Sequence, residues 1–175
     1  MTTFDFGTGP VPAHRHSNGG GWVADTAHVD ETAYVGPNAR VSEDAWVFGK
    51  AQVFGDARVS GNAQVYGKAW VYGKAWVSEN AQVFGNAWVY GYAKLIGDQW
   101  ATTPLQIHGT RDVLCQCSLT EVAIGCEIHS ISHWLKNYKA IGESHGYSEN
   151  EIEEYYCYLR LIQILNNRKR KNEKQ

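Results

Sequence analysis

The chain has 175 residues, of which 43% are hydrophobic, 19% charged and 13% aromatic, and its formal net charge at pH 7 is -2. This length accommodates one ordinary domain with a small appendage and excludes two full catalytic domains. The composition excludes a disordered polyelectrolyte and a basic protein that coats DNA. No run reaches the ~18 consecutive apolar residues of a membrane span, and the start MTTFDFGTGP has neither the basic nor the apolar segment of a signal peptide. We therefore expect a cytoplasmic protein with free thiols at its four cysteines.

The first segment, 1–20, carries a His-x-His pair close to a run of glycines. His14 and His16 precede three consecutive glycines at 19–21. Such a combination can bind a metal ion or a phosphate, but the Lys and Ser/Thr of a P-loop do not follow it. We therefore expect 1–20 to be a flexible N-terminal lead.

The middle of the chain is a continuous six-residue repeat. From 27 to 98 it consists of twelve hexads of the form Ala-x-Val-x-Gly-x, with Leu95 in place of the last Val and with Glu31, Pro37, Glu43 and Glu79 in place of Gly. The pattern extends backwards through GWVADT (21–26) and resumes in LQIHGT (105–110). Alternation of Ala and Val with outward residues predicts a short strand with one buried face, and Gly followed by Asn, Asp or Lys predicts a turn. Each hexad is therefore expected to form one strand and one corner.

Outward residues of one kind recur at every third hexad. Serine follows the core Val at 42, 60 and 78, and aromatic residues fill the same slot in the two other series. This spacing of three hexads predicts a three-sided coil in which each strand lies on the equivalent strand of the next coil at ~4.8 Å, so that like side chains stack in ladders. The fold class is therefore mainly β: a three-sided parallel β-solenoid of about five coils over 21–116, with a small C-terminal helical module.

The hexads resemble the hexapeptide repeat of left-handed β-helix proteins, which place a small residue four positions after a bulky aliphatic one. The resemblance implies a left-handed coil and assembly as a homotrimer. Acyltransferases, γ-class carbonic anhydrases and non-enzymatic scaffolds share this fold, so it leaves the function open. GPVPAHRHSNGGGWVADTA (9–27) and IGCEIHSISHWLKNY (124–138) are also similar to hexapeptide-repeat proteins of phage and prophage genomes.

After the repeat the pattern changes from strands to helices. Closing strands are expected over 117–129, with a hairpin through Ser118–Glu121. A two-helix module is expected over 130–167: apolar residues at helical spacing predict a first helix over 131–144, and the second begins at a capping box of Ser148 and Glu151. A basic tail is expected at 168–175.

An enzymatic function has one candidate residue. Hexapeptide acyltransferases use a His near a loop that interrupts the coils, and His108 is a candidate general base, but the twelve hexads run without interruption. A γ-class carbonic anhydrase needs three His around zinc, which the hexads do not supply. We therefore expect no catalytic residue, with His108 as the alternative.

The cysteines suggest one metal site. Cys115, Cys117, Cys126 and His129 are donors for a Cys3His zinc site, although their spacing matches no known finger. In a strand, Cys115 and Cys117 share a face and fill a small core, which is the interpretation that we favour. A nucleophilic Cys126 paired with His129 is a further alternative. We expect no metal and no cofactor.

Aromatic residues predict where the protein binds. Arg and Ser dominate the first face of the solenoid, whereas aromatic residues dominate the second face, Trp100 included, and the third. A soluble monomer does not expose such faces, so they are expected to be covered by other copies or by the C-terminal helices, or to bind a ligand. The predicted binding or oligomer-interface residues are Trp46, Phe48, Phe54, Tyr66, Trp70, Tyr72, Trp88, Tyr90, Trp134 and Tyr155.

These observations predict a non-enzymatic homotrimeric binding protein, phage-encoded and located in the host bacterial cytoplasm, which inhibits or sequesters a host component. The partner would be the protein itself together with a host-defence protein or a nucleotide signal, whose base could stack on the aromatic residues. Nucleic acid is not expected, because the net charge is slightly negative and the basic run sits at a terminus. The alternative is a hexapeptide-type acyltransferase with an acyl-CoA donor.

Overall fold

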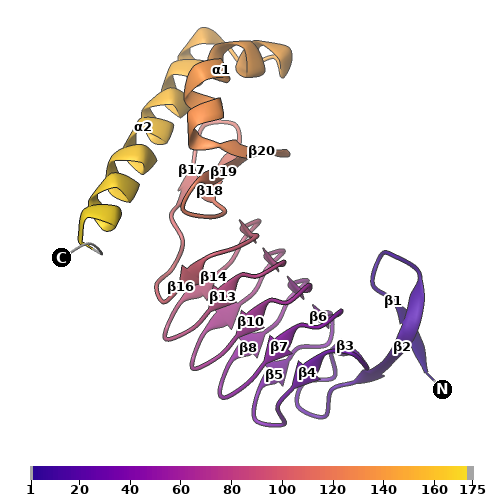
Figure 1. Cartoon of the computed structure of the whole chain (residues 1–175). Helices are drawn as coiled ribbons and strands as arrows, with labels where there is room; N and C mark the ends of the chain where they lie inside the picture. Colours follow the sequence, from indigo (N-terminus) through magenta and orange to yellow (C-terminus); the bar gives the residue numbers. More distant parts are fainter. Residues whose placement is uncertain (1, 173–175) are drawn as a thin grey trace. The chain divides into compact units, whose positions relative to one another are not determined.

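The structure is a computed structural model that describes residues 2–172, with side chains as far as residue 167. It divides into two compact units, Met1–Pro104 and Leu105–Gln175 (Figure 1). Each unit has its own hydrophobic core. The side chains of the expected basic tail, 168–175, lie outside the described residues. None of the helices in the described part of the chain has the length and apolarity needed to cross a membrane.

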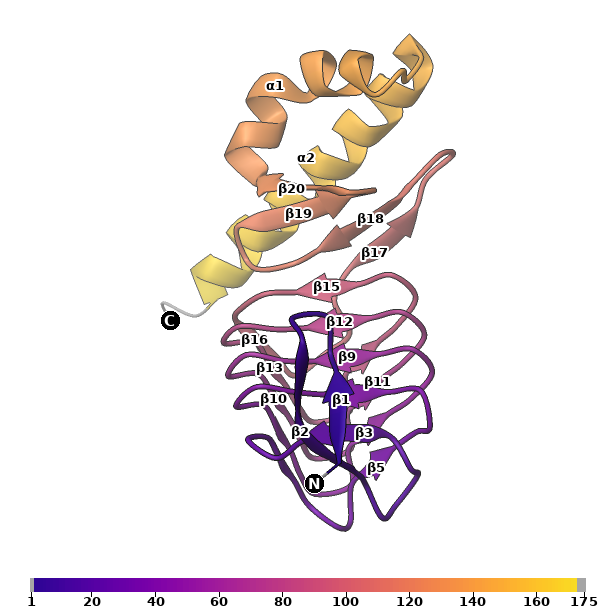
Figure 2. The ribbon, with the colours of Figure 1, turned by 90° about the vertical axis from the view of Figure 1, so that its right-hand side faces the viewer.

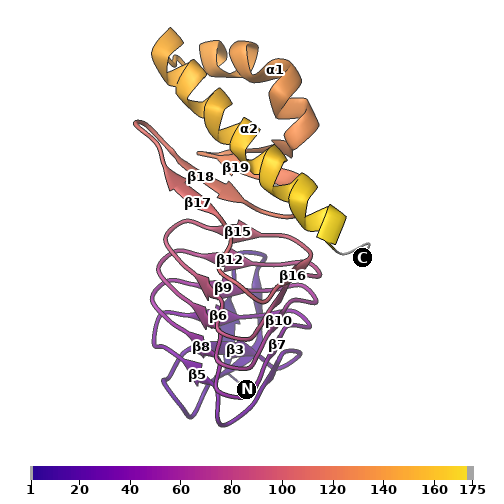
Figure 3. The same cartoon turned by 90° about the vertical axis from the view of Figure 1, so that its left-hand side faces the viewer.

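The hexads of the first unit form short parallel strands in three sheets. The first sheet has the order β3-β6-β9-β12-β15, the second β4-β7-β10-β13-β16 and the third β5-β8-β11-β14 (Figures 1 and 3). The strands are β3 (Trp22–Ala24), β4 (His28–Val29), β5 (Tyr34–Val35), β6 (Arg40–Val41), β7 (Trp46–Val47), β8 (Gln52–Val53), β9 (Arg58–Val59), β10 (Gln64–Val65), β11 (Trp70–Val71), β12 (Trp76–Val77), β13 (Gln82–Val83), β14 (Trp88–Val89), β15 (Lys94–Leu95) and β16 (Gln99–Trp100).

Consecutive strands of one sheet are separated by three hexads of sequence. Gln64 pairs with Gln82 and Val65 with Val83, and the third sheet, with four strands, shows that the solenoid makes about four turns. Backbone hydrogen bonds join successive turns, as where Gln64 N donates to Ala81 O at 2.9 Å. The expectation of a mainly-β repeat solenoid followed by two helices is confirmed.

Alanine and valine fill the interior of the solenoid. The hexad alanines are buried, and the valines at the third positions have no exposed surface from Val35 to Val89. The corners need left-handed backbone: Gly73 has φ 73°, and a Cβ there would lie 3.0 Å from Gly91 N. The glycine at the fifth position of most hexads therefore serves the turn, because Gly adopts such φ values without strain. Glu43 and Glu79 take the same left-handed backbone at this position, with φ 59° and 55°.

The N-terminal lead is ordered, so the expectation of a flexible segment was wrong. β1 (Thr3–Asp5) and β2 (Pro10–Arg15) form an antiparallel hairpin, and β2 pairs with β3 at the edge of the first sheet (Figure 2). His16 is buried with its Nε2 3.1 Å from Ala33 O, and His14 Nδ1 lies 2.8 Å from Asp25 Oδ1. Both imidazoles therefore have protein partners that hold this segment to the solenoid.

The last turn of the solenoid departs from the repeat. Gln82 pairs with Gln99 and Val83 with Trp100, so this turn lacks a residue that the preceding turn, in which Gln64 pairs with Gln82, contains. The missing residue moves Trp100 from the outward position expected for it into the core row, where it is buried and donates from Nε1 to Gly97 O at 2.8 Å. Trp100 is thus a core residue and not part of the aromatic surface.

The second unit is a four-stranded antiparallel sheet with two helices (Figure 2). Its strands are β17 (Gln106–His108), β18 (Val113–Gln116), β19 (Glu121–Ile124) and β20 (Glu127–Ser130), in that order, and its helices are α1 (Ile131–Ser144) and α2 (Glu149–Asn172).

The solenoid ends earlier than the sequence suggested, because β17 pairs antiparallel with β18, with Gln106 opposite Cys115. LQIHGT matches the hexad composition but does not form another coil, so the expected boundary at 116 was wrong. The hairpin between β18 and β19 and the first helix lie where they were expected.

The core of the second unit lies between its sheet and its helices. Leu114 and Val122 of the sheet pack with Trp134 of α1 and Leu159 of α2. The second helix begins at the expected capping box: Ser148 N donates to Glu151 Oε2 at 2.7 Å, and Glu151 N donates to Ser148 Oγ at 3.4 Å. The two bonds satisfy backbone groups that are free at a helix start and so fix the beginning of α2.

Candidate functional site

Aromatic rings stack in two ladders at the ends of the strands of the second and third sheets. In the first ladder the ring centroids of Phe48 and Tyr66 are 4.8 Å apart and those of Tyr66 and Phe84 5.1 Å apart. In the second ladder Phe54, Tyr72 and Tyr90 stack at 5.0 and 5.6 Å. The parallel register produces these ladders, because it places equivalent residues of successive turns directly over one another.

Two further aromatic pairs lie on the strands themselves. Trp70 and Trp88 stack at 5.5 Å on the third sheet, and His28 and Trp46 stack at 4.4 Å on the second. The Trp46 and Trp88 side chains are 46% and 48% exposed. The ladders and these pairs together form what we call the aromatic surface, made of His28, Trp46, Phe48, Phe54, Tyr66, Trp70, Tyr72, Phe84, Trp88 and Tyr90.

The stacking determines what the ladders can offer a partner. Neighbouring rings are parallel within 3° to 6° in the first ladder and within 4° to 17° in the second. The faces of Tyr66 and Tyr72 are therefore covered by their neighbours, and only ring edges and hydroxyls remain. A ladder thus presents a ridged apolar strip, with stacking faces free only at its end members.

The first sheet has a different surface. Its outward strand positions carry Trp22, Arg40, Arg58, Trp76 and Lys94, with serines at the corners. Trp22 stacks on Phe4 of β1, with ring centroids 4.5 Å apart. Trp76 is exposed, and its Nε1 donates to Ser60 Oγ at 3.1 Å. This sheet therefore carries three basic residues, and its two tryptophans are held by β1 and by the serine row.

Two of the residues expected to bind a partner are core residues instead. Trp134 and Tyr155 are each 4% exposed. Trp134 Nε1 donates to Val122 O at 2.8 Å, and the Tyr155 hydroxyl donates to Asp112 O at 2.7 Å. Their assignment to a binding surface was wrong, because apolar packing on the sheet of the second unit buries both rings.

The four expected zinc donors do not come together. Cys115 and Cys117 are buried on or next to β18, whereas Cys126 is exposed in the β19–β20 turn and His129 pairs with Glu127. A hydrogen bond with Cys115, together with burial, raises the pKa of the Cys117 thiol far above its ordinary value, so it stays protonated. Among the side chains that the structure describes, 2–167, no group of three or more His, Cys, Asp or Glu is arranged to hold a metal ion.

The candidate general base lies outside the solenoid. His108 is exposed on β17, the first strand of the antiparallel sheet, and Val113 is its partner across the strands. The sequence placed it on a solenoid position, which was wrong because the hexad pattern of 105–110 belongs to a different sheet. His108 therefore does not lie on the parallel coils of this chain.

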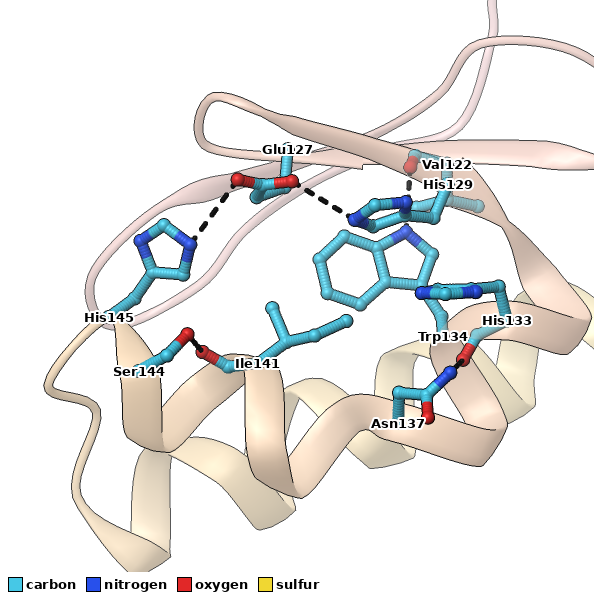
Figure 4. A network of polar contacts seen from close by, with 9 residues as sticks. All are labelled: Val122, Glu127, His129, His133, Trp134, Asn137, Ile141, Ser144 and His145. Carbon is cyan, nitrogen blue, oxygen red and sulfur yellow. Dashed lines mark hydrogen bonds and ion pairs between the residues drawn. The ribbon is translucent and has the colours of Figure 1, made fainter.

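A cluster of three histidines around one glutamate lies on the second unit and was missed by the sequence analysis. Figure 4 shows Glu127 between two imidazoles: its Oε2 is 3.0 Å from His129 Nε2, and its Oε1 is 3.3 Å from His145 Nε2. His133 stacks on His129 with centroids 4.5 Å apart. The Glu127 carboxylate joins β20 to His145, the C-cap residue of α1. The side chains of Glu127, His129 and His145 are all partly exposed to solvent.

Arg111 acts within the second unit. Its guanidinium donates to the carbonyl oxygens of His145 and Gly146 at 3.0 and 2.6 Å and lies 4.6 Å from the Tyr147 ring centroid. The Tyr147 hydroxyl donates to Asp112, and burial followed by this hydrogen bond raises the pKa of Tyr147. These contacts fix the turn between β17 and β18 to the α1–α2 connection, so the Arg111 guanidinium has a structural role within the second unit.

Comparison with known proteins supports the fold alone. Residues 51–67 match a family model described as a YdcK beta solenoid repeat, a segment close to one turn of three hexads. Searches of the curated proteins and of the solved structures gave no match to the chain. The chain is therefore a repeat β-solenoid protein with a C-terminal unit of four strands and two helices.

Proposed function

We propose that the protein is a non-enzymatic binding protein whose solenoid associates with other copies of itself through the aromatic surface. The observation that carries this proposal is the extent of stacked rings along two of the three sheets, with Trp46 and Trp88 nearly half exposed. Exposure of such an apolar strip to water is unfavourable, so covering it with a partner makes the free energy of association more favourable. The proposed assembly is a trimer of left-handed, three-sided solenoids, as the resemblance to hexapeptide-repeat proteins implies.

The ring geometry favours a macromolecule over a stacked nucleotide as the occupant. A base stacks on an open ring face, whereas the middle rings Tyr66 and Tyr72 have both faces covered by neighbours. A second ridged strip, by contrast, can pack along many ring edges at once. The repeated spacing of the rungs suits another solenoid, because both surfaces then have the same period.

The wider role is proposed on the sequence resemblance at both ends of the chain. A phage-encoded trimer in the host cytoplasm inhibits or sequesters a host-defence protein, and the irregular second unit supplies the specificity that a repeating solenoid lacks. The buried Trp134 and Tyr155 support that unit's core, so partner contacts fall to its exposed side chains.

The first test compares two faces of the solenoid. Light scattering on Trp70→Lys combined with Tyr72→Lys is expected to show a smaller particle than the wild type, since two charges are placed in the aromatic surface. Ser60→Lys on the first sheet introduces the same side chain outside that surface and is the matched control. Circular dichroism checks that each variant keeps its fold. An unchanged mass for the double variant, or a loss of assembly in Ser60→Lys, contradicts the proposed interface.

An acyltransferase remains the second candidate on the resemblance alone. His108 is exposed and is the residue that would serve as general base. Steady-state transfer from acetyl-CoA to a hydroxyl or amine acceptor, lost in His108→Ala, would replace the binding proposal. The control is His133→Ala, which removes another imidazole of the same unit and is expected to leave such an activity unchanged.

A further inference from the structure

Helix α2 carries apolar side chains on two opposite faces. One face packs into the core of the second unit with Ile152, Tyr155, Leu159 and Ile162, all buried. At about 100° per residue, the stripe of Cys157, Leu161 and Ile164 lies on the opposite side of the helix. Leu161 and Ile164 are 44% and 46% exposed, and Cys157 is exposed. A helix that only covered its own sheet would need no second apolar stripe.

The second stripe lies at the middle of the helix, and acidic side chains gather at the beginning of the helix. α2 runs from Glu149 to Asn172, so Leu161 is next to its midpoint. Its first six residues contain four glutamates. Parallel pairing of two such helices would set these glutamates against those of the other copy, whereas antiparallel pairing keeps the two acidic ends apart.

We propose that this stripe binds the same stripe of a second copy, with the two α2 helices antiparallel about a two-fold axis. The 4,3 spacing of residues 157, 161 and 164 is that of the a and d positions of a coiled-coil seam. In the symmetric pairing Leu161 meets Leu161 of the other copy at the axis, and Cys157 lies opposite Ile164. The same patch then serves on both copies, as an isologous interface requires.

This interface goes beyond the proposed trimer and does not depend on it. The trimer uses the sheets of the first unit, while the helix pair uses the outer face of α2 in the second. If both contacts form, each pair of α2 helices connects one trimer to another. With three apolar positions a side, the contact is small, so we expect it to be weak and dependent on protein concentration.

Disulfide trapping tests the pairing in the full-length protein. The native Cys157 is kept, the exposed Cys126 is changed to Ser, and Ile164→Cys is added. Positions 157 and 164 of one helix are about 10 Å apart along the axis, too far for a disulfide within the chain, because bridged Cα atoms lie within ~7 Å. Mild oxidation is expected to give a covalent dimer on a non-reducing gel, with mass spectrometry locating a 157–164 disulfide between copies.

Two controls define the outcome. Without Ile164→Cys, antiparallel pairing leaves the two copies of Cys157 about 10 Å apart, so no dimer is expected. Asn167→Cys, exposed on the flank of the helix, is expected to cross-link far less than Ile164→Cys. A 157–157 bond would show parallel pairing and overturn the proposal. No cross-link at any concentration would overturn it as well, because the stripe would then be covered by another segment or partner.

The result is separable from that of the solenoid test. Adding Trp70→Lys and Tyr72→Lys to the Ile164→Cys protein is expected to reduce the trimer and leave the disulfide dimer in place. Leu161→Lys should abolish the cross-link and leave the trimer. Loss of both contacts in either variant, with the fold intact by circular dichroism, would contradict the assignment of two independent interfaces.

Discussion

The indole Nε1 of Trp134 donates a hydrogen bond of 2.8 Å to the carbonyl oxygen of Val122. Trp134 lies on α1 and Val122 on β19, so this bond fixes the helix to the sheet from inside the core. The ring also meets His129 edge-on with centroids 5.0 Å apart. One buried residue thus holds both the core of the second unit and the floor of its histidine cluster.

Trp134 is therefore expected to be a stability residue. Trp134→Ala removes the ring and should cost ~3–5 kcal/mol of unfolding free energy. Trp134→Phe keeps most of the ring and loses the hydrogen bond, at ~1–3 kcal/mol. Urea denaturation followed by helical circular dichroism measures both. The matched control Trp76→Phe changes an exposed ring outside the aromatic surface and should be near neutral; an equal loss there would mean that burial does not decide the effect.

The Tyr155 hydroxyl should contribute more to stability than the hydroxyl of Tyr156. It accepts hydrogen bonds from Arg111 N, at 3.2 Å, and Asp112 N, and donates to Asp112 O. Tyr155→Phe leaves these backbone groups without that partner and is expected to cost ~1–3 kcal/mol. Tyr156→Phe is the control, because the Tyr156 ring stacks on Tyr138 through its face. Similar melting temperatures for the two variants would contradict the role of the hydroxyl.

A charge at the centre of the solenoid should abolish folding of the first unit. Val65 has no exposed surface and lies between Val47 and Val83 of the adjacent turns. Val65→Asp places a carboxyl where neither water nor a donor reaches it, at a cost of several kcal/mol. Gln64→Asp introduces the same residue one position earlier, on the outward side, and should fold. Proteolysis and thermal melting distinguish the two, and a stable Val65→Asp protein would refute the inward assignment.

The capping box makes the stability of α2 depend on pH. The Ser148 backbone N–H, and then its hydroxyl, donate to Glu151 and hold the pKa of that carboxyl below its ordinary 4.5. Because the folded pKa is the lower one, this stabilisation is present above the unfolded pKa and is lost as the pH falls through the folded pKa. The stability difference between wild type and Glu151→Gln should therefore shrink from about pH 6 to about pH 3.

The control for that titration is Glu153→Gln. Glu153 is exposed in the same turn of α2 and takes no part in the capping box. Its substitution should change stability little and with a flatter dependence on pH. A parallel pH profile for the two variants would show that the helix dipole, and not the Ser148 hydrogen bonds, produces the effect.

The solenoid could be predicted because every hexad has nearly the same surroundings. Alternation places Ala and Val inside, the recurrence at every third hexad places like residues over one another, and both are visible without any partner chain. Trp100 could not be placed in this way, because a single missing residue changes the register and only the pairing with Val83 reveals it. The hexad period therefore predicts whether a residue points inward only as far as the chain keeps that period.

The second unit was predictable in its elements but not in its contacts. Apolar spacing located α1, and the Ser148–Glu151 pair located the start of α2, since both signals are local. Nothing local in LQIHGT distinguishes a parallel coil from an antiparallel strand. Glu127 and His145 stand before and after the whole of α1 and meet only because that helix returns to the sheet, so their cluster needed the tertiary structure.

Because all turns have the same pitch, the length of the solenoid can change by whole turns without changing the pattern of residues on its faces. Removing three consecutive hexads, such as 51–68, would shorten the solenoid by one turn and keep every remaining ring in its own row. Removing a single hexad would shift all later hexads to the neighbouring sheet and scatter serines among tryptophans. Relatives of different length should therefore differ by whole turns, with the reach of the protein varying in steps of about 4.8 Å while its faces stay the same.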